Sequence, residues 1–102
     1  MAFTATHLQG DMDNPPIEGL SALLDELDSA DDEHPDVSIS DETGWTLSAY
    51  RSGKILYENV EDDNIAPRHL DNVPRREILR LMRELAEGNP ELLELVNWKA
   101  GY

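Results

Sequence analysis

The sequence of 102 residues contains no cysteine, and no lysine or arginine precedes Arg51. Without cysteine, a disulfide framework and thiolate catalysis are both excluded. Small secreted domains commonly rely on disulfides, so the expected compartment is a reducing cytoplasm. No apolar run approaches the roughly 20 residues that cross a membrane. Residues 1–6 also lack the basic start of a signal peptide, so we expect a soluble cytoplasmic protein.

The patterns that usually mark catalysis are missing as well. His7, His34 and His69 are far apart, and none has a second histidine at metal-ligand spacing. The glycines are isolated, so no phosphate-binding loop is present, and no nucleophile-elbow sequence occurs. The acidic triplets 31–33 and 61–63 could hold a hard cation loosely, although a solvated turn explains each of them better. We expect no enzymatic activity, no cofactor and no metal site.

Negative charge is what the chain has in excess. It carries 22 acidic and 8 basic residues, which give a formal net charge of −14. Twelve of the acids precede Arg51, whereas acids and bases nearly balance after it. This charge argues against nucleic acid or an anionic membrane as a direct ligand, since both require basic surfaces. It favours a basic partner protein, and simple solubility is the alternative reading.

The segment from Trp45 to Val60 is typical of a β-hairpin, with two strand-forming runs around the loop Arg51-Ser52-Gly53. A left-handed Gly53 suits a three-residue loop that closes with a bulge. A two-residue loop at Ser52-Gly53 would instead place Glu58 among the apolar side chains. We therefore predict that the paired residues are Ala49 with Ile55, Leu47 with Tyr57, and Trp45 with Asn59.

This register gives the hairpin two different faces. The core face would carry Trp45, Leu47, Ala49, Ile55 and Tyr57. The opposite face would carry Thr46, Ser48, Tyr50, Leu56 and Glu58. We expect Trp45 to be a core anchor, because tryptophan is highly buried on average. Tyr50 points away from the predicted core, which makes it a candidate contact residue.

Periodicity predicts the remaining elements. A strand is expected within 3–8, and a helix from Pro15 and Pro16 to about Ser29, with apolar residues at helical spacing. A second short strand follows at 37–41, and a polar loop at 61–72. The clearest helix has Pro74 in its first turn and Gly88 as a left-handed end. A short helix is expected next, with Asn89 as its cap and Pro90 in its first position. Residues 95–98 could be helix or strand.

Side-chain charges on these helices give two further expectations. Arg80 with Glu84 and Arg83 with Glu87 have the four-residue spacing of exposed ion pairs. Acids near the C-terminal end of the first helix, at 25, 26 and 28, lie at the unfavourable end of the helix dipole. Nothing local explains these acids, so solubility or a partner must account for them.

The element order favours a single α+β domain over 1–102. It reads strand, helix, three strands, helix, and a terminal helix or strand. A small antiparallel sheet of about four strands with the helices packed on one face satisfies this order. The opposite face of the sheet would then be open to water or to a partner.

The C-terminal part contains the segments Asn72-Val73-Pro74-Arg75-Arg76-Glu77-Ile78, Gly88-Asn89-Pro90 and Val96-Asn97-Trp98. In these segments it resembles a family of small bacterial immunity proteins from polymorphic toxin systems. This chain has additional residues, 91–95, between the turn and the tryptophan. Several members are similar to the partners of nucleic-acid deaminase toxins. The resemblance implies the same order of strands and helices, and a toxin as the partner.

The expected function is therefore inhibition of a cognate toxin, such as a deaminase or a nuclease, by an acidic surface that blocks a basic, nucleic-acid-targeting active site. An acidic adaptor or nucleic-acid mimic that binds another basic protein is the alternative. The candidate partner-binding residues are Asp25, Glu26, Asp28, Asp31, Asp32, Glu33, Tyr50, Glu58, Glu61, Asp62 and Asp63.

Overall fold

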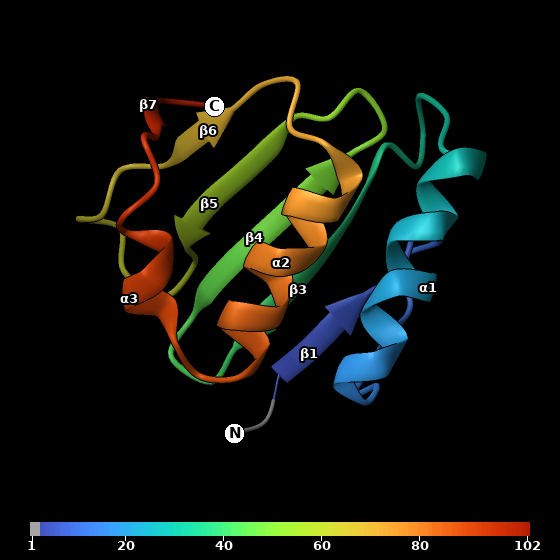
Figure 1. The fold of residues 1–102 in the computed structure, drawn as a ribbon, viewed down its shortest axis with the longest axis horizontal. Coiled ribbons are helices and arrows are strands. Elements are labelled where there is room, and N and C mark those ends of the chain that lie inside the picture. Colours follow the sequence, from blue (N-terminus) through green and yellow to red (C-terminus); the bar gives the residue numbers. More distant parts are fainter. Residues whose placement is uncertain (1–2) are drawn as a thin grey trace.

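A computed structural model describes residues 3–102, which form an antiparallel sheet with helices packed against it (Figure 1). Within this range the strand order is β2-β1-β3-β4-β5-β6-β7. The strands are β1 Phe3–Thr6, β2 Met12–Asp13, β3 Asp36–Asp41, β4 Trp45–Tyr50, β5 Ile55–Asn59, β6 Arg68–Leu70 and β7 Lys99–Ala100. The helices are α1 Leu20–Asp25, α2 Arg75–Ala86 and α3 Pro90–Leu93, and the 3-10 turns η1 Ile17–Gly19 and η2 Glu26–Ser29 flank α1.

The three helices lie on the same face of the sheet, as expected (Figure 1). Helix α2 packs on β3 and β4, and α1 packs beside α2. Leu20, Leu24, Leu81 and Met82 from these helices belong to the same buried cluster as the core side of the sheet. Burial of this continuous apolar layer supplies the main drive for folding. The α+β class with an antiparallel sheet is therefore confirmed.

The hairpin formed by β4 and β5 has the expected register. The paired residues are Ala49 with Ile55, Leu47 with Tyr57, and Trp45 with Asn59. Gly53 adopts a φ of 94°, and its N–H donates to the carbonyl of Tyr50 at 3.0 Å. The three-residue loop with a left-handed glycine is therefore confirmed.

The outer face of the hairpin is less open than expected. Thr46 and Ser48 are each 8% exposed, and Leu56 is 6% exposed. The helices lie on the other face of the sheet (Figure 1). The Thr46 hydroxyl lies 2.8 Å from the Ser40 hydroxyl and also donates to the carbonyl of Gly44. The centre of this face is thus largely buried.

The expected number of about four strands is wrong. Within residues 3–102 the sheet has seven, because β2, β6 and β7 extend it on both sides. Arg68 to Leu70 was expected to be loop, but it pairs with the free edge of β5. Met12 and Asp13 form β2, a strand that the sequence did not predict, and Met12 pairs with Thr6. These strands have two or three residues, too few for a pattern of alternating burial to be visible.

Helix α2 begins at Arg75, directly after Pro74, and ends at Ala86. Gly88 follows with a φ of 87°, which confirms the predicted left-handed end. The expected ion pairs are not found among the described side chains. Arg80 binds Glu77, three residues earlier, instead of Glu84. Positions three and four apart are both neighbours on a helix, so Arg80 has a choice of partner.

The C-terminal segment contains a short helix and a short strand, separated by residues 94–98. Pro90 is the first residue of α3, preceded by Asn89, whose side chain makes no capping hydrogen bond. Residues 95–98 form neither helix nor strand, and β7 follows at Lys99. Within residues 3–102, no helix has the length and apolar character needed to cross a membrane.

Candidate partner-binding site

Acidic side chains gather at one end of the sheet, where the β3–β4 turn, the β5–β6 loop and α3 meet. We call this region the acidic end. Hydrogen bonds join two of these segments: the N–H of Val60 donates to the carbonyl of Gly44 at 3.0 Å, and the Asn59 amide donates to the carbonyl of Thr43 at 3.3 Å. The acidic end carries Asp41, Glu42, Glu61, Asp62, Asp63, Glu91 and Glu94.

Side chains within the turns hold these segments in place. One carboxylate oxygen of Asp41 accepts hydrogen bonds from the N–H groups of Thr43 and Trp45, at 2.8 and 3.0 Å. The N–H of Glu61 donates to the Asn59 side chain at 2.9 Å, and the N–H of Asn64 donates to Asp62 at 3.0 Å. Such local contacts are the reason that Asp and Asn favour turns. The acidic end is therefore presented on fixed loops.

The first of two hollows at this end is acidic. It has a volume of about 310 Å³ and is lined by Glu58, Asn59, Val60, Asp62, Asp63, Ile65, Pro67 and Tyr102. Val60 is 55% exposed and Tyr102 is 71% exposed, so apolar surface borders the carboxylates. We call this the acidic hollow. It contains three of the predicted site residues, and a fourth, Glu61, lies beside them in the same loop.

The second hollow has a volume of about 480 Å³. It is lined by Trp45, Ile65, Arg68, Pro90, Glu91 and Glu94, and we call it the aromatic hollow. Ile65 borders both hollows, so they lie on either side of the β5–β6 loop. The sequence did not assign a binding role to any of these six residues. Arg68 was expected to be loop, and only the docking of α3 brings Glu91 and Glu94 next to it.

A stack of three aromatic rings supports the aromatic hollow. The Trp45 and Tyr57 centroids are 4.9 Å apart, and those of Tyr57 and Trp98 are 5.3 Å apart. Tyr57 in the middle is fully buried, whereas Trp45 is half-buried and borders the hollow. Trp98 is fixed by its indole N–H, which donates to the carbonyl of Leu93 at 2.7 Å. Trp45 therefore packs against the core, as expected, and also borders a hollow.

Arg68 lies beside this stack and binds Glu94 through two hydrogen bonds. Its terminal nitrogens donate to the two carboxylate oxygens at 2.6 and 2.9 Å. Its guanidinium is 5.1 Å from the Tyr57 ring centroid, within cation–π distance. These hydrogen bonds hold the pKa of Glu94 below its usual range. Glu91, also in this hollow, has no basic partner among the described residues.

The other predicted acids lie at the opposite end of the sheet. The β3–β4 register places Asp36 beside Tyr50, whereas Trp45 and Asn59 mark the end from which the acidic end projects. The loop 31–35 leads into β3 at Asp36, and Figure 1 shows it on the far side of the sheet from the β5–β6 loop. The structure therefore separates the predicted residues into two groups at opposite ends of the sheet.

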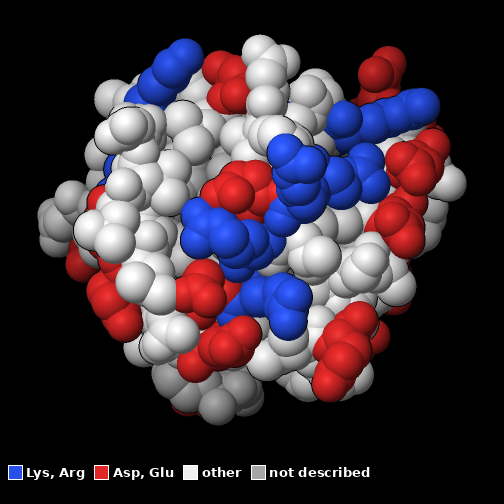
Figure 2. Space-filling model, in the orientation of Figure 1, with Lys and Arg blue, Asp and Glu red and all other residues white. Residues whose placement is uncertain are grey.

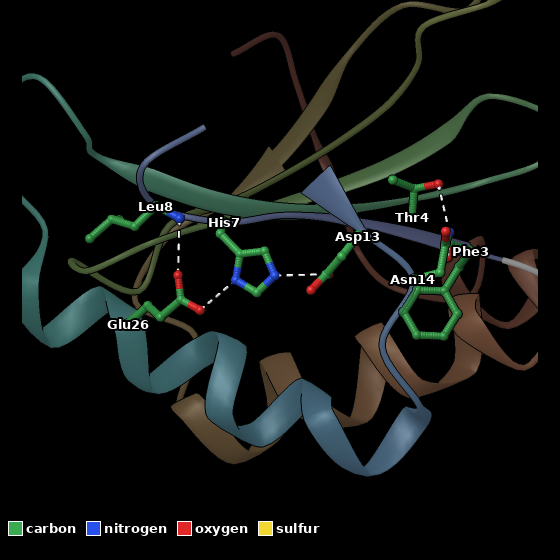
Figure 3. A network of polar contacts seen from close by, with 7 residues as sticks. All are labelled: Phe3, Thr4, His7, Leu8, Asp13, Asn14 and Glu26. Atoms are coloured by element: carbon green, nitrogen blue, oxygen red, sulfur yellow. Dashed lines mark hydrogen bonds and ion pairs between the residues drawn. The ribbon is translucent and has the colours of Figure 1, made fainter. Parts of the chain in front are cut away.

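Among the N-terminal acids, Glu26 is already used within the protein (Figure 3). Its carboxylate contacts Nδ1 of His7 at 2.6 Å and accepts the N–H of Leu8 at 3.1 Å. Nε2 of His7 contacts Asp13 at 2.8 Å. The hydrogen bonds to Glu26 and Asp13 raise the pKa of His7 to about 9. This network ties the β1–β2 hairpin to η2.

Asp25 and Asp28 also have a basic neighbour. Nη2 of Arg75 donates to Asp28 at 3.4 Å, and Nη1 lies 4.0 Å from Asp25. Nη1 of Arg75 also donates to the carbonyl of Leu24 at 3.0 Å. The end of α1 thus meets the start of α2, where negative charge is favourable. This contact corrects the expectation that only solubility or a partner explains these acids.

The loop 31–33 is stabilised by one of its own acids. Asp31 accepts hydrogen bonds from the N–H groups of Glu33 and His34, at 3.0 and 2.8 Å. Asp32 and Glu33 are exposed.

Tyr50 is half-buried on the outer face, with the Lys54 ammonium 5.6 Å from its ring centroid. Burial, followed by the nearby charges of Asp36 and Glu58, raises the pKa of Tyr50.

Basic side chains gather on a different surface. Figure 2 shows them in a band across the helical face, over α2, whose sequence carries Arg75, Arg76, Arg80 and Arg83. Half of the basic residues of the protein are thus in one helix. A basic partner would be repelled by this band and attracted to the acidic end.

Two further findings bear on function. Within residues 3–102, no three histidine, aspartate or glutamate side chains lie close enough together to hold a metal ion. In comparisons with known proteins, no family model, curated protein or solved structure matches this chain.

Proposed function

We propose that this protein is an immunity protein that binds a toxin with a basic, nucleic-acid-targeting active site and blocks it. The observation that carries the proposal is the gathering of acids from two separate segments, 58–63 and 91–94, around two hollows at the acidic end. Arg68 is the basic residue that lines these hollows, and Glu94 neutralises it. The resemblance of the C-terminal sequence to immunity proteins supports the same proposal.

The proposed mechanism is binding without catalysis. A toxin that acts on nucleic acid needs a basic cleft to hold phosphates. The carboxylates of Glu58, Asp62 and Asp63 would occupy such a cleft and exclude the substrate. Exposed Val60 and Tyr102 would add apolar contact beside the charges. The proposed site of action is the cytoplasm, because small secreted domains usually rely on disulfides and this chain has no cysteine.

Charge would act mainly on the speed and the orientation of binding. A net charge of −14 attracts a basic protein over a distance set by the ionic strength, about 10 Å at 0.1 M salt. The basic band on α2 would turn the helical face away from the partner. Association should therefore be fast and should slow as salt is added.

Inhibition of the toxin encoded beside the gene of this protein tests the proposal. We expect its activity on nucleic acid to fall in proportion to added protein and to vanish at one equivalent. Excess nucleic acid should compete with the inhibitor. A neighbouring toxin that retains full activity at several equivalents would refute the proposal and favour the acidic adaptor. Inhibition that nucleic acid cannot relieve would refute the blocking of the active site.

A further inference from the structure

The aromatic hollow contains one carboxylate without a basic partner among residues 3–102 and one tryptophan that is only half-buried. Glu91 has no basic partner among the described residues, whereas Glu94 is bound by Arg68. Trp45 stacks on Tyr57, and the Arg68 guanidinium lies 5.9 Å from its ring centroid. The half-buried side chain of Trp45 also borders the hollow. Ile65 and Pro90 complete the walls with apolar surface.

The charges of this hollow select the class of side chain that it can take. Among its lining residues, Glu91 and Glu94 oppose Arg68, so the local charge is negative. The terminal nitrogens of Arg68 both donate to Glu94, so they already have an anionic partner and do not favour an anionic ligand. A neutral apolar side chain would remove Glu91 from water without giving it a partner, which is costly. A cation satisfies Glu91 and gains from the indole of Trp45.

Arginine fits better than lysine for geometric reasons. Its guanidinium is planar, so it can stack on an aromatic ring while it donates to a carboxylate. It is also more weakly hydrated than an ammonium group, so its transfer into a partly apolar hollow costs less. The three carbons of its stem would contact Ile65 and Pro90. Tryptophan is the aromatic side chain that attracts cations most strongly.

We infer that the aromatic hollow is a binding site for an arginine side chain of the partner protein, with the guanidinium stacked on Trp45 and paired with Glu91. The inference rests on the proposed function, since that function supplies a basic partner. The acidic hollow, on the other side of the β5–β6 loop, would contact the surrounding basic surface. The arginine would fix the orientation of the complex, as buried arginine anchors do in other interfaces.

Titration of the ¹⁵N-labelled full chain with N-acetylarginine amide tests this inference without any partner protein. The chain has two tryptophans, and their indole N–H signals report separately. We expect a saturable shift of the Trp45 signal with a millimolar dissociation constant. The signal of Trp98 should move much less, because its N–H is bound to Leu93. N-acetyllysine amide should bind at least about fivefold more weakly.

Matched ligands and variants separate the charge from the shape. N-acetylcitrulline amide has nearly the same shape without the charge and should give no saturable shift. Glu91→Gln should weaken arginine binding about tenfold, the cost of one charged hydrogen bond. Glu87→Gln, an exposed change outside both hollows, should bind as the wild type does. Equal binding of citrulline or lysine, or a Trp45 signal that does not move, would overturn the inference.

The outcome of the arginine titration is independent of the outcome of the toxin inhibition assay. If arginine amide does not bind but the protein still inhibits the toxin, the inference fails and the function stands. If arginine amide binds at Trp45 but the neighbouring toxin is not inhibited, the site stands and the function fails. A complex with the toxin that is unaffected by Glu91→Gln would also contradict the role of this hollow in binding the partner.

Discussion

Both ring nitrogens of His7 face carboxylates, Glu26 on one side and Asp13 on the other. Ionised carboxylates only accept hydrogen bonds, so both nitrogens must donate and the ring must carry a positive charge. The pKa of His7 rises from 6.5 to about 9 for this reason. Its stabilising contribution is therefore complete below about pH 6.5, the ordinary pKa of histidine. It is lost as the pH rises through 9.

The variant His7→Gln tests this network. At pH 6 we expect the free energy of unfolding to fall by about 1 kcal/mol, a modest value because the contacts are partly open to water. At pH 10 the wild-type ring is neutral, so the difference between the two proteins should nearly vanish. Urea unfolding at the two pH values measures both differences. An equal loss at both would show that charge does not stabilise this network.

Tyr57 provides a second test at the scale of one residue. Its hydroxyl is buried and has no hydrogen-bond partner among residues 3–102. An unpaired buried hydroxyl costs roughly 1–3 kcal/mol, so Tyr57→Phe should leave stability unchanged or raise it by about 1 kcal/mol. Phenylalanine keeps the ring stack with Trp45 and Trp98. The control Tyr50→Phe, at a half-buried hydroxyl, should change stability little.

Thermal unfolding of the two variants is the measurement. A clear drop in the free energy of unfolding for Tyr57→Phe, with no drop for Tyr50→Phe, would mean that the Tyr57 hydroxyl is satisfied in solution. The account of the aromatic stack would then need a polar partner for Tyr57.

At the scale of elements, the hairpin loop depends on Gly53 for two reasons. Its φ of 94° lies in the left-handed region. A Cβ there would also lie 3.2 Å from the backbone of Val73, whose N–H donates to the Gly53 carbonyl. Gly53→Ala should therefore cost about 1–2 kcal/mol for the backbone alone, and more for the displaced segment at 72–73.

Gly10 is a matched control for this loop. Its φ of 92° is nearly the same, but no atom lies within 4 Å of the position of an added Cβ. Gly10→Ala should therefore show the backbone cost alone. Urea unfolding should rank Gly53→Ala below Gly10→Ala in stability. The opposite order, or equal losses, would show that close packing against Val73 does not matter.

The hairpin register could be predicted because two independent local signals agree. Glycine at the third loop position requires one loop length, and that length keeps Glu58 away from Leu47, Ala49 and Ile55. The strands β2, β6 and β7 could not be predicted in this way. Each is too short to show alternation, and each forms because a neighbouring strand offers a free edge.

In the candidate site, too, the location of some residues could be predicted from the sequence and that of others could not. Asp62 and Asp63 are adjacent in sequence and follow Glu58 by four and five residues. Their joint location could therefore be predicted. Glu91 and Glu94 reach the same end only because α3 docks beside β6. Glu94 binds Arg68, which lies 26 residues earlier in the sequence. Conversely, Asp28 is bound by Arg75 across 47 residues, a contact that no local pattern reveals.

At the scale of the whole molecule, charge is distributed unevenly. The basic band of α2 covers part of the helical face, and the acidic end lies where β4 begins and β5 ends (Figures 1 and 2). This arrangement makes the charge distribution asymmetric, and its direction, from the basic band to the acidic end, steers a basic partner towards the acidic end. The net charge alone could not show this direction, because it reports only a sum.

Two variants with equal net charge test the direction itself. The first carries Glu58→Gln, Asp62→Asn and Asp63→Asn in the acidic hollow. The control carries Asp11→Asn, Asp32→Asn and Glu33→Gln, three exposed acids outside that hollow. Each variant removes three negative charges from the net −14, so long-range attraction is reduced equally. Any difference between them reports the place where the partner binds.

The most direct measurement is the dissociation constant of the complex between each protein and the toxin encoded beside its gene. We predict that the acidic-hollow variant binds about a hundredfold more weakly than the wild type, roughly tenfold for each of the two best-placed charges. The control should remain within about threefold of the wild type, a change of under 1 kcal/mol. Equal affinities for the two variants at low salt, or a greater loss in the control, would contradict the account.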